Sequence, residues 1–444
     1  MKRFSFLSVA LFAAATTFAA ANLADGLKVE DYSYPTRADK YNLANNWISS
    51  VAEGNFIKPG EDGMVRGMVV IDGTMYFVNR ELSALVPVDV ATGQMGEPII
   101  ITGEHLFQAE TEVEGVMEWK SAVTLPFNDV KVDQAGNVLI GACITNSQTF
   151  FVYKVNLETG EATQVIKERL YDNPDFAELD YRFEGFGVYG DVDGDACIMA
   201  VDGKSVNTYR WLIEGGVAGP AEQIAYMFDE AYDTSINGTV TAFTTPQILP
   251  QDEVGSLFYV DGKGYFPVLI DEDGMLIQDF ISYAPSKAVK VVNNVGDTLT
   301  VDGGMNGMVE FEIAGEYFLL MAASNFNMSI PSTFALFKFK DSARNFADLE
   351  PMWYFPVKGL GDGSTKNTCF TAPVSVHVEG QKATISVYSQ NLGYAVYTMT
   401  TDGSAAAVEN VETGKVGAEK FVENGQMYIL KNGVKYNALG AEVK

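Results

Sequence analysis

Cysteine and histidine are scarce in this sequence, and their scarcity argues against several common kinds of site. The 444 residues include three cysteines and two histidines. Three cysteines far apart in a chain of this length do not make the even, closely spaced framework of small disulfide-rich proteins. Two histidines are too few for the usual zinc sites, which draw on several His and Cys ligands. Neither His105 nor His377 has a neighbouring partner that would indicate a Ser-His-Asp or Cys-His catalytic arrangement.

Each cysteine lies in or beside an apolar, strand-like run, at Cys143, Cys197 and Cys369. This context predicts buried free thiols, because cysteine without a partner behaves as a small apolar side chain. The alternative is a disulfide between Cys143 and Cys197, which would join two neighbouring repeats.

Positive charge is also scarce. The chain has 30 Lys and Arg against 58 Asp and Glu, which gives a formal net charge of −28. Nucleic-acid binding needs cations that displace phosphate counterions, so this balance argues against it, and it argues equally against adhesion to anionic lipid. Hydrophobic residues make up 47% of the chain, enough for a packed core, so we expect a folded protein with an acidic surface rather than a disordered acidic chain.

Long apolar runs are absent except at the N-terminus. Lys2 and Arg3 precede an apolar stretch over residues 4–15, and Ala19-Ala20-Ala21 follows. This is the pattern of a secretion signal over residues 1–21, and the stretch is too short to span a membrane. We therefore predict an exported protein without a transmembrane anchor, located in the periplasm, on the cell surface or outside the cell. Residues 22–39 would form a lead-in to the folded part.

A turn followed by an apolar run recurs every 58–65 residues. The six turns are Asp72-Gly73, Ala135-Gly136, Asp193-Gly194, Val254-Gly255, Ala314-Gly315 and Glu379-Gly380. In several repeats a second Gly turn follows about 20 residues after the first, as at Thr92-Gly93 and Thr159-Gly160. The pattern predicts four antiparallel strands in each repeat, which is one blade of a β-propeller.

We therefore predict an all-β fold in which residues 40–403 form a six-bladed β-propeller. The last repeat lacks a clear fourth strand, so the segment Asn45–Val51 is expected to complete that blade and close the ring. A seven-bladed propeller is the alternative, if a degenerate blade lies in residues 94–125 or 275–305.

The C-terminal residues form a separate unit in this prediction. Residues 404–418 are small and polar, which is typical of a linker. Residues 419–444 contain Asn424-Gly425 and Asn432-Gly433, which are strong signals for two-residue hairpin turns. We expect a small C-terminal β-hairpin module.

Two stretches resemble an uncharacterised family of secreted Bacteroidetes β-propellers, a domain of unknown function. One is LANNWISSVAEGNF with the following RGMVVIDGTMYFVNRELSALVPVDVATG, and the other is FGVYGDVDGDACIMAVDG. The similarity rests on Trp47, Arg66-Gly67, Asp72-Gly73, Val88-Asp89 and Thr92-Gly93. It covers residues 40–403 and implies the propeller fold without an established activity.

The tail resembles the short C-terminal sorting-type segments of exported Bacteroidetes proteins. Gly425, Tyr428, Asn432-Gly433 and Val443-Lys444 carry this similarity. The segment YNALG near the end departs from the usual order of a type IX sorting signal. The resemblance implies either a sorting segment or a small terminal module.

The repeat also predicts where a ligand would bind. Propeller ligands commonly sit at one mouth of the central channel, next to the starts of the innermost strands. Counting back from each turn glycine places six equivalent residues there: Arg66, Asn128, Phe186, Gln247, Asn306 and Thr371. Five are polar, and Arg66 would pair with an acidic group of a sugar or a peptide end.

A second candidate site is the run Asp191, Asp193 and Asp195, whose alternating carboxylates are able to converge on Ca²⁺. An ordinary Asp-Gly hairpin turn is the alternative. The leading functional hypothesis is a binding or scaffold protein of the cell envelope, with a glycan or protein ligand at the channel mouth. The alternative is a polysaccharide-acting glycoside hydrolase or lyase that uses carboxylates at the same mouth.

Overall fold

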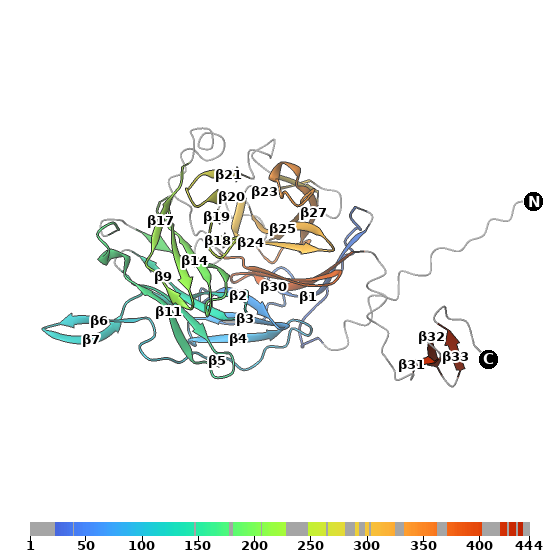
Figure 1. Ribbon diagram of the computed structural model, residues 1–444, viewed down its shortest axis with the longest axis horizontal. Helices are drawn as coiled ribbons and strands as arrows, with labels where there is room; N and C mark the ends of the chain where they lie inside the picture. The colour runs from blue at the N-terminus through green and yellow to red at the C-terminus, as the bar shows by residue number, and fades with distance from the viewer. Residues whose placement is uncertain are drawn as a thin grey trace, which may run out of the picture.

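The protein is a six-bladed β-propeller followed by a small β unit. The computed structural model describes residues 23–437 apart from residues 39, 146–147, 177–180, 206, 228–246, 263–264, 280–288, 293–297, 302, 325–332, 362–370, 402–417, 424–425 and 432–433. Six antiparallel sheets of four or five strands are arranged around one axis (Figure 1). The predicted six-bladed architecture is confirmed.

Each blade runs from an inner strand at the channel to an outer strand at the rim. Blade 1 consists of β2 (Val65–Ile71), β3 (Thr74–Asn79), β4 (Ala84–Asp89) and β5 (Ile99–Ile100). Blade 2 consists of β8 (Leu125–Val132), β9 (Val138–Thr145), β10 (Phe150–Val155) and β11 (Ala162–Glu168), and β12 (Arg182–Phe183) also pairs with β9. Blade 3 consists of β13 (Gly187–Gly190), β14 (Ala196–Val201), β15 (Asn207–Glu214), β16 (Val217–Ala218) and β17 (Glu222–Ala225).

The other three blades repeat this plan. Blade 4 consists of β18 (Gln247–Pro250), β19 (Leu257–Gly262), β20 (Tyr265–Asp271) and β21 (Leu276–Asp279). Blade 5 consists of β24 (Gly303–Ile313), β25 (Glu316–Ser324), β26 (Thr333–Lys338) and β27 (Glu350–Phe355). Blade 6 consists of β28 (Val374–Glu379), β29 (Lys382–Ser389), β30 (Gly393–Thr401) and β1 (Tyr41–Ser50).

The first strand of the chain closes the ring. β1 pairs with β30 from Tyr41↔Thr401 to Ser50↔Gly393, and Figure 1 shows the two strands side by side. Trp47 of β1 is fully buried, and its indole Nε1 donates to Val90 O at 2.8 Å. β1 thus leaves no free edge on β30 and ties blade 6 to blade 1, as predicted for Asn45–Val51.

The two long stretches that were candidates for a seventh blade contain two-stranded hairpins. β6 (Gln108–Val113) pairs with β7 (Val116–Ser121), and β22 (Val289–Val292) pairs with β23 (Thr298–Val301). Figure 1 shows the β6–β7 hairpin projecting from the propeller. A hairpin of two strands cannot pack as a four-stranded blade does, so the seven-bladed alternative is wrong.

Turn chemistry and apolar packing explain why the repeats fold in this way. In the inner hairpin of blade 1, Asp72 and Gly73 have φ values of 47° and 72°. Both are positive, as a type I′ turn requires. Between blades 6 and 1, the ring of Tyr394 lies 5.6 Å from Trp47 and 5.2 Å from Phe77, centroid to centroid. Each blade therefore buries its faces against its neighbours.

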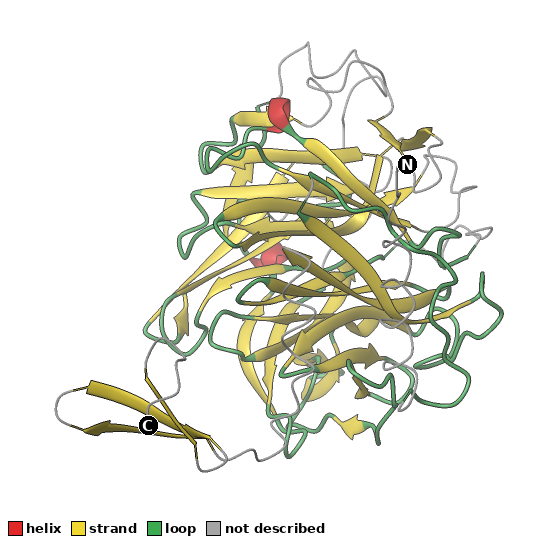
Figure 2. Cartoon of the chain, turned by 90° about the vertical axis from the view of Figure 1, so that its right-hand side faces the viewer, coloured by secondary structure: helices red, strands yellow, loops and turns green. Residues whose placement is uncertain are grey.

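Helix is almost absent from the described residues (Figure 2). The helical elements there are two 3₁₀ turns, η2 (Leu170–Asp172) and η3 (Phe346–Asp348). In the part of the chain that the structure describes, no helix is long and apolar enough to cross a membrane. The predicted signal segment, residues 1–21, lies outside the described residues.

The C-terminal unit is a three-stranded antiparallel sheet. It consists of β31 (Ala418–Glu423), β32 (Gln426–Lys431) and β33 (Val434–Asn437) in that order. The hairpin turns predicted at Asn424-Gly425 and Asn432-Gly433 lie outside the described residues. Residues 404–417 of the predicted linker lie outside the described residues, and its last residue, Ala418, begins β31.

Candidate functional site at the channel

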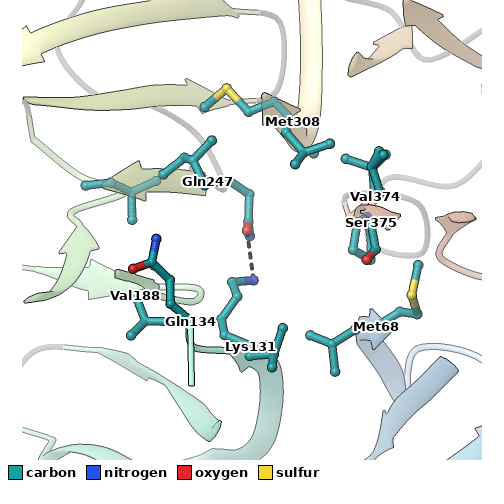
Figure 3. A pocket seen from close by; sticks show the side chains of 17 residues that line it. Met68, Lys131, Gln134, Val188, Gln247, Met308, Val374 and Ser375 are labelled. Atoms are coloured by element: carbon teal, nitrogen blue, oxygen red, sulfur yellow. Dashed lines mark hydrogen bonds between the residues drawn. The ribbon is translucent and has the colours of Figure 1, made fainter. Parts of the chain in front are cut away.

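The inner strands of all six blades surround a cavity of about 440 Å³ (Figure 3). Its lining is largely apolar and includes Val188 and Val374 as well as Met68 and Met308, whose side chains are themselves buried in the packing between blades (Figure 3). Among the described lining residues only Lys131 is charged. Lys131 Nζ donates to Asp129 Oδ1 at 2.8 Å and to Gln247 Oε1 at 3.2 Å. The volume is in the range of small-ligand pockets, and the lining is largely apolar with one neutralised cation.

The predicted site residues gather at one end of this cavity, where the inner strands begin; we call it the entry end. Gln247 lines the cavity itself. Arg66, Asn128, Phe186 and Thr371 each come one to three residues before a lining residue of their own blade. The backbone of Asn306 belongs to β24, and its side chain lies outside the described residues.

Two of these side chains are engaged in the core. Phe186 is 2% exposed, and a Cβ added at Gly141 would lie 2.8 Å from its ring. Phe186 therefore fills the space between blades 2 and 3 and does not line the cavity. Thr371 is buried, and its hydroxyl donates to Gln390 Oε1 at 3.3 Å.

Arg66 and Asn128 belong to a charged cluster, which we call the entry cluster. It joins blade 1, blade 2 and the connection from blade 2 to blade 3. Arg66 Nη1 of blade 1 lies 3.0 Å from Glu184 Oε2, and Arg182 Nε lies 2.5 Å from Glu184 Oε1. Asn128 Nδ2 of blade 2 donates to Glu184 O at 2.6 Å. Asn128 Oδ1 accepts a hydrogen bond from Arg80 Nη2. Arg66, Arg80, Asn128, Arg182 and Glu184 thus form one network at the entry end.

The entry cluster carries excess positive charge in a strongly acidic chain. It holds three guanidinium groups and one carboxylate, Glu184. The side chains of Glu184 and Arg66 are 4% and 10% exposed, whereas that of Arg182 is 39% exposed. Burial, and then the neighbouring Arg66, lower the pKa of Arg80. Nε of Arg66 is buried without a hydrogen-bond partner among the described residues. The cluster is therefore able to accept a further anionic group.

Cys143 lies beside this cluster, and its environment makes it unreactive. Burial raises the pKa of its thiol to about 12, and the nearby Glu184 adds to the shift. At neutral pH the side chain of Cys143 therefore stays protonated, and a protonated thiol is not a nucleophile. Cys143 and Cys197 are buried free thiols, as predicted, so the alternative disulfide between them does not form. Cys369 lies outside the described residues.

Sequence reasoning did not find Arg80 and Arg182. Counting back from each turn glycine finds only the start of an inner strand. In an antiparallel hairpin the end of the second strand lies next to that start. Arg80 comes directly after β3, seven residues after Gly73, so a forward count would have found it. Arg182 lies in the connection between blades 2 and 3, whose course no repeat pattern predicts.

The three aspartates of the calcium hypothesis serve different partners. Asp191 Oδ1 accepts from Asp193 N at 2.9 Å, and Asp195 Oδ1 accepts from Gly215 N at 2.9 Å. Asp193 Oδ1 accepts from Lys154 Nζ. The described residues contain no group of three His, Cys, Asp or Glu side chains arranged to hold a metal ion. In this structure the run therefore works as a hydrogen-bonded turn.

Similar proteins indicate the fold and leave the activity open. A family described as a domain of unknown function (DUF8500) matches residues 111–266, about a third of the chain. No curated protein matches the sequence. A crystal structure of a DUF4623 family protein from Bacteroides eggerthii is similar with a TM-score of 0.53 and 12% identity, covering 85% of this chain and 87% of that chain. At this identity the likeness concerns the fold alone.

Two further solved structures are similar at a lower level. The PQQ-bound aldose sugar dehydrogenase of Streptomyces coelicolor has a TM-score of 0.40 and 11% identity, covering 83% of this chain and 100% of that chain. A mutant Trypanosoma rangeli sialidase displaying trans-sialidase activity has a TM-score of 0.37 and 12% identity, covering 88% of this chain and 61% of that chain. Scores of this size support no inference about function.

Proposed function

We propose that this protein is an exported binding protein whose entry cluster holds a glycan that carries a carboxylate. The observation that supports this most is the excess of three guanidinium groups over one carboxylate at the channel entry of a chain with net charge −28. Arginine binds carboxylates through two parallel N–H donors, which gives both affinity and orientation. The apolar cavity below would take a less polar part of the same ligand.

The exported location is part of this proposal and rests on the N-terminal sequence pattern. The acidic surface also favours it indirectly, because an acidic chain repels acidic glycans except where positive charge is concentrated. Specific binding of an acidic glycan would therefore be limited to the entry cluster. We expect the affinity for an acidic glycan to fall as the salt concentration rises.

The hydrolase alternative has less support. Hydrolysis of a glycosidic bond needs two carboxyl groups that face the bond from opposite sides. Glu184 is held by two arginines, and Asp129 accepts from Lys131 Nζ and from Phe186 N at 3.1 Å. Both carboxylates are thus occupied by partners within the protein.

The test is a glycan array that contains matched acidic and neutral oligosaccharides, followed by titration calorimetry with the acidic glycan that binds best. Arg182→Ala removes the most exposed guanidinium of the cluster and is expected to weaken binding about tenfold or more. Arg169→Ala is the control, because Arg169 forms an exposed ion pair with Asp172 at 2.8 Å outside the cluster. Equal binding of acidic and neutral glycans, or an unchanged affinity in Arg182→Ala, would refute the proposal.

A further inference from the structure

A second cavity lies at the opposite end of the channel, where the inner strands of blades 3, 4 and 5 end. Its volume is about 380 Å³. Val188, Leu249 and Val309 line both this cavity and the central one. Beyond them the lining changes to aromatic and polar side chains, which include Tyr189, Gln251, Glu310, Tyr317 and Arg344. We call this cavity the exit groove.

One wall of the exit groove is an aromatic ring with a guanidinium above it. Arg344 Cζ lies 5.9 Å from the centroid of the Tyr317 ring. Tyr317 is half-buried, and the Arg344 side chain is 45% exposed. Aromatic rings offer a flat apolar face that excludes water from one side of a ligand. The wall therefore presents both an apolar surface and hydrogen-bond donors.

The polar groups beside this ring are held in place by buried contacts. Arg344 Nη1 lies 2.9 Å from Glu310 Oε2, and the hydroxyl of Tyr259 donates to Glu310 Oε1 at 2.7 Å. The side chain of Glu310 is 11% exposed and Tyr259 is 2% exposed, so the carboxylate is fixed from the protein side. A guanidinium has five N–H donors in a plane, so Arg344 is able to bind a ligand oxygen while it holds Glu310.

We propose that the exit groove is a binding site for an uncharged sugar ring. The charges of Arg344 and Glu310 cancel, and the exposed Glu312 leaves the lining with a net negative charge, so this site disfavours the anionic ligands that the entry cluster attracts. A pyranose has an apolar C–H face that would pack against the part of the Tyr317 ring that Arg344 leaves uncovered. Its equatorial hydroxyls would hydrogen-bond to Arg344 and Glu310. This proposal concerns a different site and a neutral ligand, and it holds or fails independently of the proposed function.

The experiment measures binding of the full mature chain to cellohexaose, xylohexaose, mannohexaose and laminarihexaose by titration calorimetry. Tyr317→Ala and Arg344→Ala are each expected to weaken the best of these ligands about tenfold or more. Tyr317→Phe keeps the stacking face and should bind nearly as well as the parent. Melting temperatures of all variants establish that each one is folded.

The chain offers a matched control pair outside any described cavity. Arg169 Cζ lies 5.3 Å from the ring of Tyr171, and Arg169 Nη1 lies 2.8 Å from Asp172 Oδ1. Arg169, Tyr171 and Asp172 therefore combine the same three kinds of side-chain group as Arg344, Tyr317 and Glu310, at the exposed 3₁₀ turn η2. Tyr171→Ala and Arg169→Ala should leave the affinity unchanged. Failure of all four hexasaccharides to bind at about 10 mM, or binding that survives both groove substitutions, would overturn the proposal.

Discussion

Replacing Glu184 by Gln tests whether the entry cluster is a true buried ion-pair network. The substitution keeps the size of the side chain and removes its charge. Glu184 and Arg66 are 4% and 10% exposed, so the loss leaves a buried guanidinium uncompensated. Breaking a buried pair costs about 3–5 kcal/mol. Arg182 is 39% exposed and contributes less, and the Gln amide oxygen still accepts one bond. We therefore expect a loss of about 3 kcal/mol.

This loss is measured as a shift in the urea unfolding midpoint and in the melting temperature. With an unfolding entropy of about 2.1 cal/mol/K per residue, the propeller of about 360 residues has roughly 0.8 kcal/mol/K. A change of about 3 kcal/mol then lowers the melting temperature by about 4 °C. The matched control is Glu222→Gln, because Glu222 is 52% exposed and pairs with Arg210 at 2.7 Å. That control should cost less than about 1 kcal/mol.

The same variant also tests the anion affinity of the cluster. In Glu184→Gln the arginines lack their internal anion, so sulfate should stabilise this variant more than the parent, by preferential binding to the folded state. Sulfate stabilises proteins in general through exclusion from their surface, and the increase in Glu222→Gln measures that part. The reasoning is refuted if Glu184→Gln unfolds within about 1 kcal/mol of the parent, or if sulfate stabilises both variants equally.

Three more substitutions test the ring and the buried carboxyl groups. Trp47→Ala, which empties the junction of blades 6 and 1, should cost about 4 kcal/mol in urea unfolding; a loss below about 1 kcal/mol would contradict its role in closure. Glu30→Ala removes a carboxylate that accepts from two tyrosine hydroxyls and one backbone amide, and a cost of about 2–4 kcal/mol together with faster proteolysis near residue 37 is expected. Burial raises the pKa of Asp261 from its ordinary value of 3.8 to about 7; its contribution is therefore present below pH 3.8 and lost as the pH rises through about 7. Asp261→Asn should remove this pH dependence, and parallel stability curves for variant and parent between pH 4 and about 8 would argue against it.

Local patterns account for much of the fold, and the hairpins show why. Asp72-Gly73 adopts a turn with two positive φ values because the residues themselves favour it. The apolar runs after each turn become strands because one face is buried against the next blade. The place of β1 in blade 6 also follows from the number of strands in each repeat, because the last repeat has three strands and needs a fourth. The number of blades needed the structure, because a two-stranded hairpin such as β6–β7 and a degenerate blade have similar sequence patterns.

The candidate site is less predictable from the sequence. The repeat placed Arg66 and Asn128 near the starts of their inner strands, where both contact Glu184. The partner of Arg66 is Glu184, 118 residues away, in a connection between blades that has no repeat pattern. Phe186 was expected beside the ligand, yet its ring packs into the core against Gly141. Side-chain direction at a strand start depends on the neighbouring blade, which a count along one chain cannot describe.

The repeat, the strand order within each blade, the acidic composition and the scarcity of histidine and cysteine can all be read from the amino-acid sequence. These properties depend on interactions between residues near one another in the chain, or on composition alone. Tertiary structure decided which charges meet at the entry end and which aromatic ring faces the exit groove. Both depend on how the six sheets are placed around one axis, and that placement is set by packing between residues far apart in the sequence.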